Sequence, residues 1–290
     1  MVDPGGDLSG KRILVTGASS GIGLAASLEF ARAGADVVMH VRDRSRGEAA
    51  RERIAAETGS ERTELLLADF ADLGAVASAA EEYARRYDRL DVLAANAGAI
   101  MPDHVITEHG NELTFQVNHL AHFLLCRILE PILVASGPAR VVTVSSDSHQ
   151  AAWRGIRFED PAFRRGWRSF PAYAHSKLAN IMFCYEHARR LFRTGVTSTV
   201  MHPGFVYTHF GADAYGRLNP LINKVVYPTI GRTPERGADT LVWLATSPEV
   251  EGATGAYFQD RRMHHSSRAS MDLEAQRRLW EMSEELTGLA

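Results

Sequence analysis

Residues 12–23 read RILVTGASSGIG, and this stretch decides the fold. The apolar run Arg12–Thr16 stops at Gly17, as a short buried strand does, and the helical pattern of Leu24–Ala33 comes after the turn. A strand, a glycine-rich turn and a helix in this order are typical of a pyrophosphate cradle. Glycines let the backbone approach the phosphates, and the helix N-terminus offers N–H groups that have no partner within the helix.

The spacing of these glycines is Gly-xxx-Gly-x-Gly, which differs from the Gly-x-Gly-xx-Gly of the common dinucleotide fingerprint. A tight turn without a ligand is therefore the alternative interpretation. The strand before the turn and the helix after it favour a dinucleotide site.

Further apolar segments alternate with helical patterns along the chain. The expected strands are Asp36–Val41, Glu64–Ala68, Leu90–Ala95, Ala139–Val144 and Thr197–Met201, and the expected helices include Gly47–Thr58, Leu73–Tyr87, Glu112–Ser136, Pro234–Thr246 and Leu273–Leu286. This alternation predicts βαβ crossovers and an α/β fold. We expect a single-domain Rossmann fold, a doubly wound parallel sheet flanked by helices, with ligands at the carboxyl ends of the strands.

The residues after the second strand predict which nucleotide is bound. Arg42 follows that strand directly, where a guanidinium can clamp a 2′-phosphate, and Arg44 or Arg46 would add positive charge. The alternative is Asp43, twenty residues after Gly23, as a carboxylate that binds the ribose hydroxyls of NAD(H). Because Arg42 comes first, the sequence favours NADP(H) over NAD(H).

Tyr173 and Lys177 stand four residues apart, so on a helix they share a face. A phenol has an unperturbed pKa near ~10, and a nearby ammonium lowers it by favouring the phenolate. Such a pair is a plausible proton donor for a carbonyl oxygen. The alternative is a surface pair in which Lys177 merely extends along the helix.

Bulk properties exclude several classes of protein. The chain has 290 residues, is 45% hydrophobic and carries a net charge of −3, which does not indicate a nucleic-acid or membrane-surface partner. Cys126 and Cys184 lie in apolar helical patterns and are expected to be reduced core residues. The first ten residues lack the apolar run of a signal peptide or anchor, and we find no uninterrupted apolar segment long enough to span a bilayer. No histidine shows the ligand spacing of a zinc site, so we expect no metal. These features predict a cytoplasmic protein that acts on a small molecule.

Taken together, the motifs resemble the short-chain dehydrogenase/reductase family. They are Thr16–Gly23, Asn96-Ala97-Gly98, Asn118, Ser145-Ser146, Tyr173-xxx-Lys177 and Pro203-Gly204, and the likeness covers roughly residues 10–258. Within the family the chain looks most like the retinol dehydrogenase branch, with the WW-domain oxidoreductases and protochlorophyllide reductases nearby. The segments 117–120, 176–180 and 202–204 and the tail 279–286 carry this closer likeness.

The resemblance implies a catalytic set of Asn118, Ser146, Tyr173 and Lys177. Tyr173 would be the general acid in carbonyl reduction or the base in alcohol oxidation. Lys177 would lower the pKa of Tyr173 and bond the nicotinamide ribose. Ser146 would hold the substrate oxygen, and Asn118 would support a water-mediated proton relay by bending the long helix.

The same resemblance implies a set of cofactor contacts. Gly17, Ser19, Ser20, Gly21, Ile22 and Gly23 would line the pyrophosphate, Asp69 with Phe70 would meet the adenine, Asn96 with Ala97 and Gly98 would meet the adenosine ribose, and Pro203, Gly204, Val206 and Thr208 would contact the nicotinamide end. Tyr173 and Lys177 would also touch the cofactor.

By this resemblance, residues 10–204 would form the dinucleotide-binding and catalytic core, 205–232 a substrate lid and 233–290 the end of the sheet and a helix. Apolar residues in the lid suit a lipophilic or aromatic carbonyl compound. Ser146 and Tyr173 stand 27 positions apart, and the insert between them is rich in Arg and Trp. It is interpreted as a surface lobe that packs its aromatic residues on the domain, with a nucleic-acid or anionic partner as the alternative. The sequence does not fix the oligomeric state, and a homo-oligomer is one of the alternatives.

Three functions follow in order of preference. The first is an NADP(H)-dependent oxidoreductase that interconverts a carbonyl compound and an alcohol. The second is a reductase of an activated C=C bond. The third is a non-catalytic protein that senses NADP(H), which the presence of Ser146, Tyr173 and Lys177 disfavours.

Overall fold

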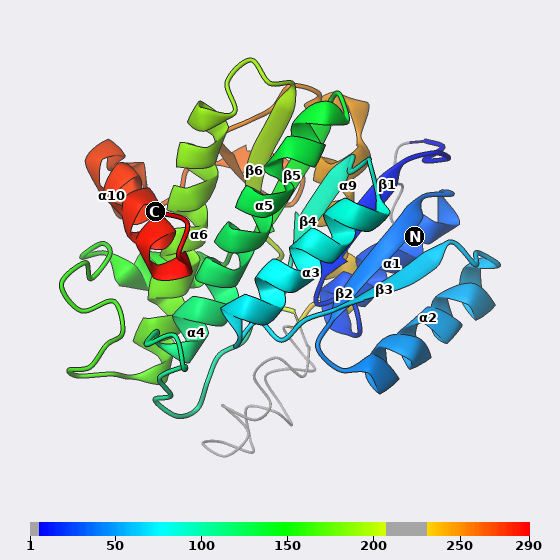
Figure 1. The fold of residues 1–290 in the computed structure, drawn as a ribbon. Coiled ribbons are helices and arrows are strands. Elements are labelled where there is room, and N and C mark those ends of the chain that lie inside the picture. Colours follow the sequence, from blue (N-terminus) through cyan, green and yellow to red (C-terminus); the bar gives the residue numbers. More distant parts are fainter. Residues whose placement is uncertain (1–5, 207–230) are drawn as a thin grey trace.

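A single eight-stranded sheet, in the order β3-β2-β1-β4-β5-β6-β7-β8, forms the centre of the computed structural model, which describes residues 6–206 and 231–290 (Figure 1). The strands are β1 Arg12–Thr16, β2 Asp36–Val41, β3 Thr63–Leu67, β4 Val92–Ala95, β5 Ala139–Val144, β6 Val196–His202, β7 Ala256–Gln259 and β8 Arg262–His264. Strands β1 to β7 pair in parallel and β8 pairs antiparallel to β7. The predicted doubly wound Rossmann fold is confirmed.

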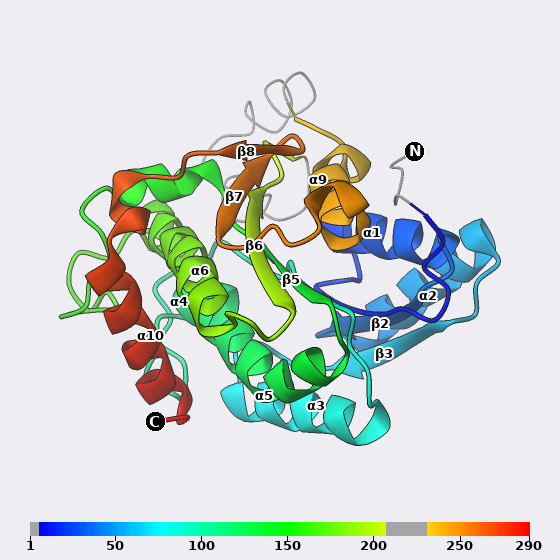
Figure 2. The same ribbon diagram turned by 90° about the horizontal axis from the view of Figure 1, so that it is seen from above.

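Helices cover both faces of the sheet, as the view from above shows (Figure 2). They are α1 Gly21–Arg32, α2 Arg44–Thr58, α3 Leu73–Arg86, α4 Leu113–Phe115, α5 Ala121–Ala135, α6 Ser169–Arg190, α9 Pro234–Thr246 and α10 Leu273–Thr287. One apolar core joins the sheet to α1, α2 and α9, and a second joins it to α3, α5 and α6, with α10 packed on α6. Strands covered on both faces read as nearly continuous apolar runs, which explains why their positions are readable from the sequence.

Two helices begin earlier than predicted, for reasons that are local. The helix α2 starts at Arg44 rather than Gly47, because the Asp43 side chain accepts a hydrogen bond from Arg46 N at 2.8 Å and caps it. The helix α1 starts at Gly21 rather than Leu24, within the glycine-rich turn itself. The N-terminus of α1 therefore lies inside the predicted pyrophosphate cradle.

The long helix predicted over Glu112–Ser136 is not uniformly α-helical. It consists of α4, a π-helical turn over Gln116–Leu120, and α5, which continues through Pro131 to Ala135. By length and composition alone Leu113–Ala135 could cross a membrane, which corrects the expectation that no segment is long enough. In this fold the helix packs between α3 and α6, and a buried core helix passes the same test.

The insert before α6 packs most of its aromatic residues on the domain, as predicted. Trp167 Nε1 donates to Glu112 Oε1 at 3.2 Å, and its ring stacks on His104. Phe163 is buried against the His175 ring. Trp153 is the exception, because 70% of it is exposed. Cys126 and Cys184 are buried free thiols, as predicted.

Candidate active site

Tyr173 and Lys177 lie one turn apart on α6, with Lys177 Nζ 5.6 Å from the centre of the Tyr173 ring. Lys177 is buried, whereas Tyr173 is half-buried. The ammonium donates to Val144 O at 3.2 Å, at the carboxyl end of β5. Burial lowers the pKa of Lys177 to about 8, so at neutral pH the group is charged but easily neutralised. The two residues therefore share a face and a charge environment, which excludes the alternative of a surface pair.

The serine pair follows β5 directly and contacts the same helix. Ser145 is buried, and its Oγ donates to Lys177 O at 2.7 Å. Ser146 is half-buried, and its Oγ accepts a hydrogen bond from Ser148 N at 3.2 Å at the start of a 3-10 turn. His149 Nδ1 lies 2.7 Å from Ser146 O and its Nε2 accepts from Ser267 N, so this histidine makes core hydrogen bonds. Of the two serines, Ser146 is therefore the one that is partly exposed.

Asn118 occupies the middle of the π-helical turn and is fully buried. Its side-chain oxygen accepts from Ala99 N at 2.7 Å, and its Nδ2 donates to Ala99 O and to Ser176 Oγ, both at 2.9 Å. Ser176 Oγ in turn donates to Tyr173 O at 2.8 Å. Asn118 therefore ties the loop after β4 to the helix of Tyr173. π-Helical turns are frequent at functional sites, which agrees with the predicted bend in this helix.

The glycine-rich turn requires glycine at specific positions. Gly17 and Gly21 have φ angles of +68° and +57°. A Cβ at Gly23 would lie 2.3 Å from Gly17 O and 2.7 Å from Asn96 Nδ2. Ser19, Ser20 and Ile22, which lie between these glycines, are all half-buried.

The N-terminus of α1 suits an anion. Ser20 makes no side-chain capping bond with the described residues, and the first turn of α1 has no acidic residue. By contrast, side chains cap α2, α3, α9 and α10. The N–H groups and the positive end of the α1 dipole are therefore available to a phosphate group.

Gly23→Ala should lower the affinity for NADPH at least ~10-fold and destabilise the fold by about 1–3 kcal/mol, because the new methyl group must displace backbone. Thermal melting with and without NADPH measures both effects. Gly74→Ala, in the first turn of α3, is the matched control, since the nearest atom to its Cβ is Asp72 Oδ1 at 3.2 Å. Equal stabilisation of Gly23→Ala and wild type by NADPH would contradict the cradle.

The residues after β4 close the cradle from the other side. Asn96 Nδ2 donates to Thr16 O at 2.8 Å, and the backbone N–H groups of Asn96 and Ala97 both donate to Thr16 Oγ1 at 2.9 Å. Gly98 follows and is half-buried. The end of β1 and the end of β4 thus form one hydrogen-bonded unit at this edge of the sheet.

Among the residues predicted to meet the adenosine half of the nucleotide, or named as the alternative, Arg42 is exposed and Asp43 is engaged as the cap of α2. Asp69 is exposed, and its Oδ1 accepts from Ala71 N at 2.9 Å. The Phe70 ring is buried and stacks on His40, so its side chain packs behind the turn. Asp43, the alternative ribose-binding residue, is thus engaged in capping, whereas the Arg42 side chain is exposed.

The residues predicted at the nicotinamide end that the structure describes, Pro203, Gly204 and Val206, follow β6. Gly204 has a φ of +78°, and a Cβ there would lie 2.7 Å from Arg232 Nε. Arg232 pairs with Asp260, which holds the guanidinium over this glycine. Thr208 lies outside the described residues, as do residues 207–230 of the predicted lid.

Sequence reasoning did not assign roles to Thr16, His122, Ser176 or Arg232. Thr16 is a buried polar residue at the last position of β1, and His122 follows Asn118 by one helical turn. The position of Thr16 at the end of β1 and that of His122 one turn after Asn118 were the sequence signals that could have indicated a role. The pairing of Thr16 with His122 spans 106 residues and has no local signature.

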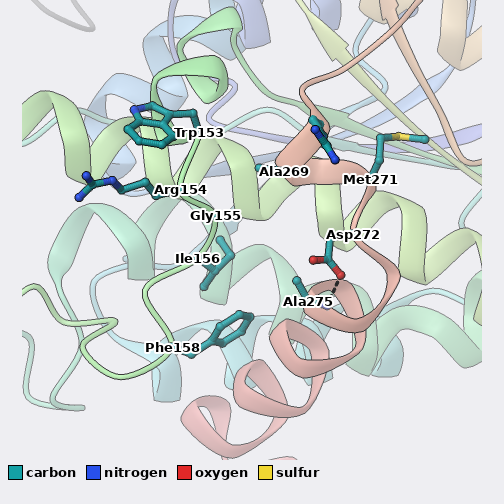
Figure 3. Close-up of a pocket in the computed structure, with 10 residues that line it drawn as sticks. Trp153, Arg154, Gly155, Ile156, Phe158, Ala269, Met271, Asp272 and Ala275 are labelled. Atoms are coloured by element: carbon teal, nitrogen blue, oxygen red, sulfur yellow. Dashed lines mark hydrogen bonds between the residues drawn. The ribbon is translucent and has the colours of Figure 1, made fainter.

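Within the described residues, no group of three or more His, Cys, Asp or Glu side chains is placed to hold a metal. A groove of about 670 Å³ runs between Trp153–Phe158 and the start of α10, with Met271 and Ala275 on its far wall (Figure 3). None of the predicted catalytic or cofactor residues lines this groove.

Comparisons with known proteins agree with this geometry. The family model of the short chain dehydrogenases matches residues 11–158. Retinol dehydrogenase 14 of Homo sapiens is 42% identical over 98% of this chain and 89% of its own length. A protein of Streptomyces sp. (strain C5) assigned as a daunorubicin C-13 ketoreductase is 39% identical over 98% of this chain and 95% of its own. A solved structure assigned as an NAD(P)-dependent gluconate 5-dehydrogenase from Beutenbergia cavernae, with NADP bound at low occupancy, has a TM-score of 0.69 at 30% identity. It covers 87% of this chain and 95% of its own.

Proposed function

Because the chain belongs to the short-chain dehydrogenase/reductase family, in its retinol dehydrogenase-like branch, we propose that it is an NADP(H)-dependent oxidoreductase that interconverts a lipophilic or aromatic carbonyl compound and an alcohol. Family membership establishes the coarser activity, an NAD(P)-dependent carbonyl–alcohol oxidoreductase. The choice of NADP(H), the substrate class and the roles of individual residues are the proposal.

One observation carries it. Lys177 is buried one turn from the half-buried Tyr173 and is bonded twice to the strand end that presents Ser146: its Nζ donates to Val144 O, and its backbone O accepts from Ser145 Oγ. A proton donor, a cation and a hydroxyl thus stand at the carboxyl end of β5, at the sheet edge that carries the glycine-rich turn. Parallel α/β sheets bind ligands at this edge.

Bound NADPH would supply the hydride for the carbonyl carbon. Tyr173 gives its phenolic proton to the developing alkoxide oxygen, and the Lys177 ammonium stabilises the phenolate that remains. The Ser146 hydroxyl donates a hydrogen bond to the same oxygen. In alcohol oxidation the phenolate takes the proton back. Asn118 holds the loop at Ala99 and the helix at Ser176, which fixes the position of Tyr173 relative to the end of β4.

The substrate class rests on two lines of support. Relatives of the chain include proteins named for retinol and for daunorubicin, which fits a lipophilic or aromatic carbonyl substrate. Phe205, which follows Gly204 next to the proposed nicotinamide site, is apolar and 49% exposed.

The proposal includes a cytoplasmic location, as predicted from the sequence.

The test is the loss of nicotinamide absorbance with purified protein, NADPH or NADH, and a panel of aldehydes and ketones that includes retinal. Turnover that requires NADPH and ranks lipophilic carbonyl compounds first supports the proposal. Binding of NADPH without turnover of any carbonyl compound would instead support a sensing role. Preference for NADH would overturn the cofactor assignment.

Arg42→Gln should raise the KM for NADPH about 10–100-fold and leave the KM for NADH within about threefold, because only NADPH has the phosphate that this guanidinium would bind. Initial rates with each nucleotide measure the effect. Arg51→Gln is the matched control, since Arg51 is an exposed arginine on α2 that pairs with Glu48. If both variants behave alike, the effect is one of overall charge and the assignment of Arg42 is wrong.

A further inference from the structure

His122 is a buried side chain in α5 that the proposed chemistry does not use. Its Nε2 lies 2.9 Å from Thr16 Oγ1, and its Nδ1 lies 3.1 Å from Asn118 O. Thr16 precedes the glycine-rich turn, and Asn118 lies in the π-helical turn. His122 therefore bridges the two parts of the site that bind the nucleotide and position the proton donor.

The hydrogens in this bridge can be assigned from the partners. Thr16 Oγ1 already accepts two backbone N–H groups, those of Asn96 and Ala97, so its own proton is the one to be donated. The nearest acceptor is His122 Nε2, at 2.9 Å, whereas Ala94 O is at 3.4 Å. Asn118 O can only accept, so His122 Nδ1 has the proton. The ring is thus neutral and in one tautomer.

The surroundings keep the ring neutral and fixed. The Phe70 ring meets the His122 ring edge-on with centroids 5.0 Å apart. Burial, aided by the positive charge of Lys177, lowers the pKa of His122 to about 3. A neutral ring has one donor and one acceptor, and both are used.

The residues that His122 contacts make further hydrogen bonds on either side of it. Toward the nucleotide they run to Thr16 and then to Asn96, whose Nδ2 lies at the cradle glycines. Toward the proton donor they run through the Asn118 side chain to Ser176 and to the backbone of Tyr173. Together these bonds connect β1, the end of β4, the π-helical turn with α5, and α6.

We propose that His122 is a positioning residue that holds the glycine-rich turn and the Tyr173 helix in register, with one arm to Thr16 that serves nucleotide binding and one arm to Asn118 that serves catalysis. This inference rests on the proposed function. It separates from that function because each arm has its own measurable consequence.

Two substitutions cut one arm each. In His122→Asn the amide Nδ2 can replace Nδ1–H as donor to Asn118 O, but the acceptor for Thr16 is lost. In His122→Gln the amide oxygen can replace Nε2 as acceptor for Thr16, but the donor to Asn118 is lost. We expect His122→Asn to raise the Kd for NADPH about tenfold and to leave kcat at saturating NADPH within about threefold of wild type. We expect His122→Gln to lower kcat about tenfold and to leave the Kd for NADPH within about threefold. NADPH fluorescence gives Kd, and initial rates with the carbonyl compound that wild type reduces best give kcat.

Thr16→Val and Ser176→Ala test the same chain from its ends if a His122 variant does not fold. Thr16→Val removes the bond to His122 together with the acceptor for Asn96 N and Ala97 N, so it should lower the NADPH affinity at least as much as His122→Asn. Adding His122→Asn to Thr16→Val should lower the affinity no further, because the bond that His122→Asn removes is already absent. Ser176→Ala should lower kcat and leave Kd unchanged. His119→Gln is the matched control: His119 is buried in the same π-helical turn but its Nε2 pairs with Ser283 Oγ of α10. It should lower the melting temperature and leave both constants unchanged.

The outcomes are distinguishable. If His122→Asn and His122→Gln shift Kd and kcat together, or shift only the melting temperature as His119→Gln does, His122 is a packing residue and the inference is wrong while the proposed function stands. If wild type binds no dinucleotide, both fail. A change in Kd alone for His122→Asn and in kcat alone for His122→Gln would establish the two arms, provided that His122→Asn has no further effect on Kd in the Thr16→Val background.

Discussion

Tyr173→Phe should lower kcat for carbonyl reduction by about 10²–10⁴-fold while the Kd for NADPH stays within about threefold. The substitution removes one hydroxyl and keeps the ring, so the packing of α6 and the position of Lys177 are preserved. What is lost is the proton that neutralises the developing alkoxide. Without this proton, hydride transfer would leave a charged alkoxide oxygen that the phenol can no longer neutralise.

The matched control is Tyr185→Phe, three turns further along the same helix. Its hydroxyl lies 2.7 Å from Ser266 Oγ, away from the residues proposed for chemistry, so removing it should leave kcat unchanged. Initial rates and NADPH fluorescence on all three proteins suffice. If Tyr173→Phe and Tyr185→Phe have the same rate as wild type, the proton comes from elsewhere and the proposed mechanism is wrong. A loss of NADPH binding in Tyr173→Phe would show instead that the hydroxyl supports the nucleotide site.

The strands were predictable because burial on both faces writes them into the sequence as apolar runs. The bounds of β1, β2 and β5 agree with the predicted ones, and so do those of α9, where Thr233 caps a helix that begins with Pro234. The strand β8 is different. All three of its residues are exposed, so no apolar pattern marks it.

The interior of the site was only partly predictable. Motif order placed Tyr173, Lys177 and Ser146 at one sheet edge, where the structure has them. The π-helical turn at Asn118 has no local signature, because its partners are the backbone of Ala99 and the hydroxyl of Ser176 on another helix. The start of α1 depends likewise on a contact that the turn makes with itself, between Gly23 and Gly17 O. The first feature arises from packing between distant segments and the second from backbone geometry within one turn, and a periodicity analysis detects neither.

Acidification from pH 7 to pH 5.5 should destabilise the fold by about 5 kcal/mol and lower its melting temperature by about 10–20 °C. Seven histidines of the described part of the chain are buried, and for four of them burial lowers the pKa far below its usual range, to about 4 for His40 and to about 3 for His119, His122 and His175. In the unfolded chain their pKa is the ordinary value near 6.5. Below that value the unfolded state binds more protons than the folded one, so stability falls as pH falls.

The size of the effect follows from the number of groups. Each histidine contributes a slope that approaches about 1.4 kcal/mol per pH unit once the pH is well below 6.5, and the slope persists down to the folded pKa. A domain is stable by only about 5–15 kcal/mol, so four such groups remove a large part of that between pH 6.5 and pH 5. Carboxylates with lowered pKa values, such as Asp91 and Asp260, act in the same direction but only near pH 4 and below.

His175→Gln isolates the contribution of one histidine. His175 Nε2 accepts a hydrogen bond from Arg157 N at 3.0 Å, and an amide oxygen can take that role without titrating. Urea unfolding of wild type and His175→Gln between pH 7.5 and pH 5 should therefore show a slope smaller by about 1 kcal/mol per pH unit in the variant. If the free energy of unfolding of wild type stays constant from pH 7 to pH 5, the buried histidines bind as many protons in the folded state as in the unfolded state. Their rings would then be protonated, or hydrated enough to be protonated, in the folded protein. Because His122 is one of the four, that result would also remove the basis for a neutral ring between Thr16 and Asn118.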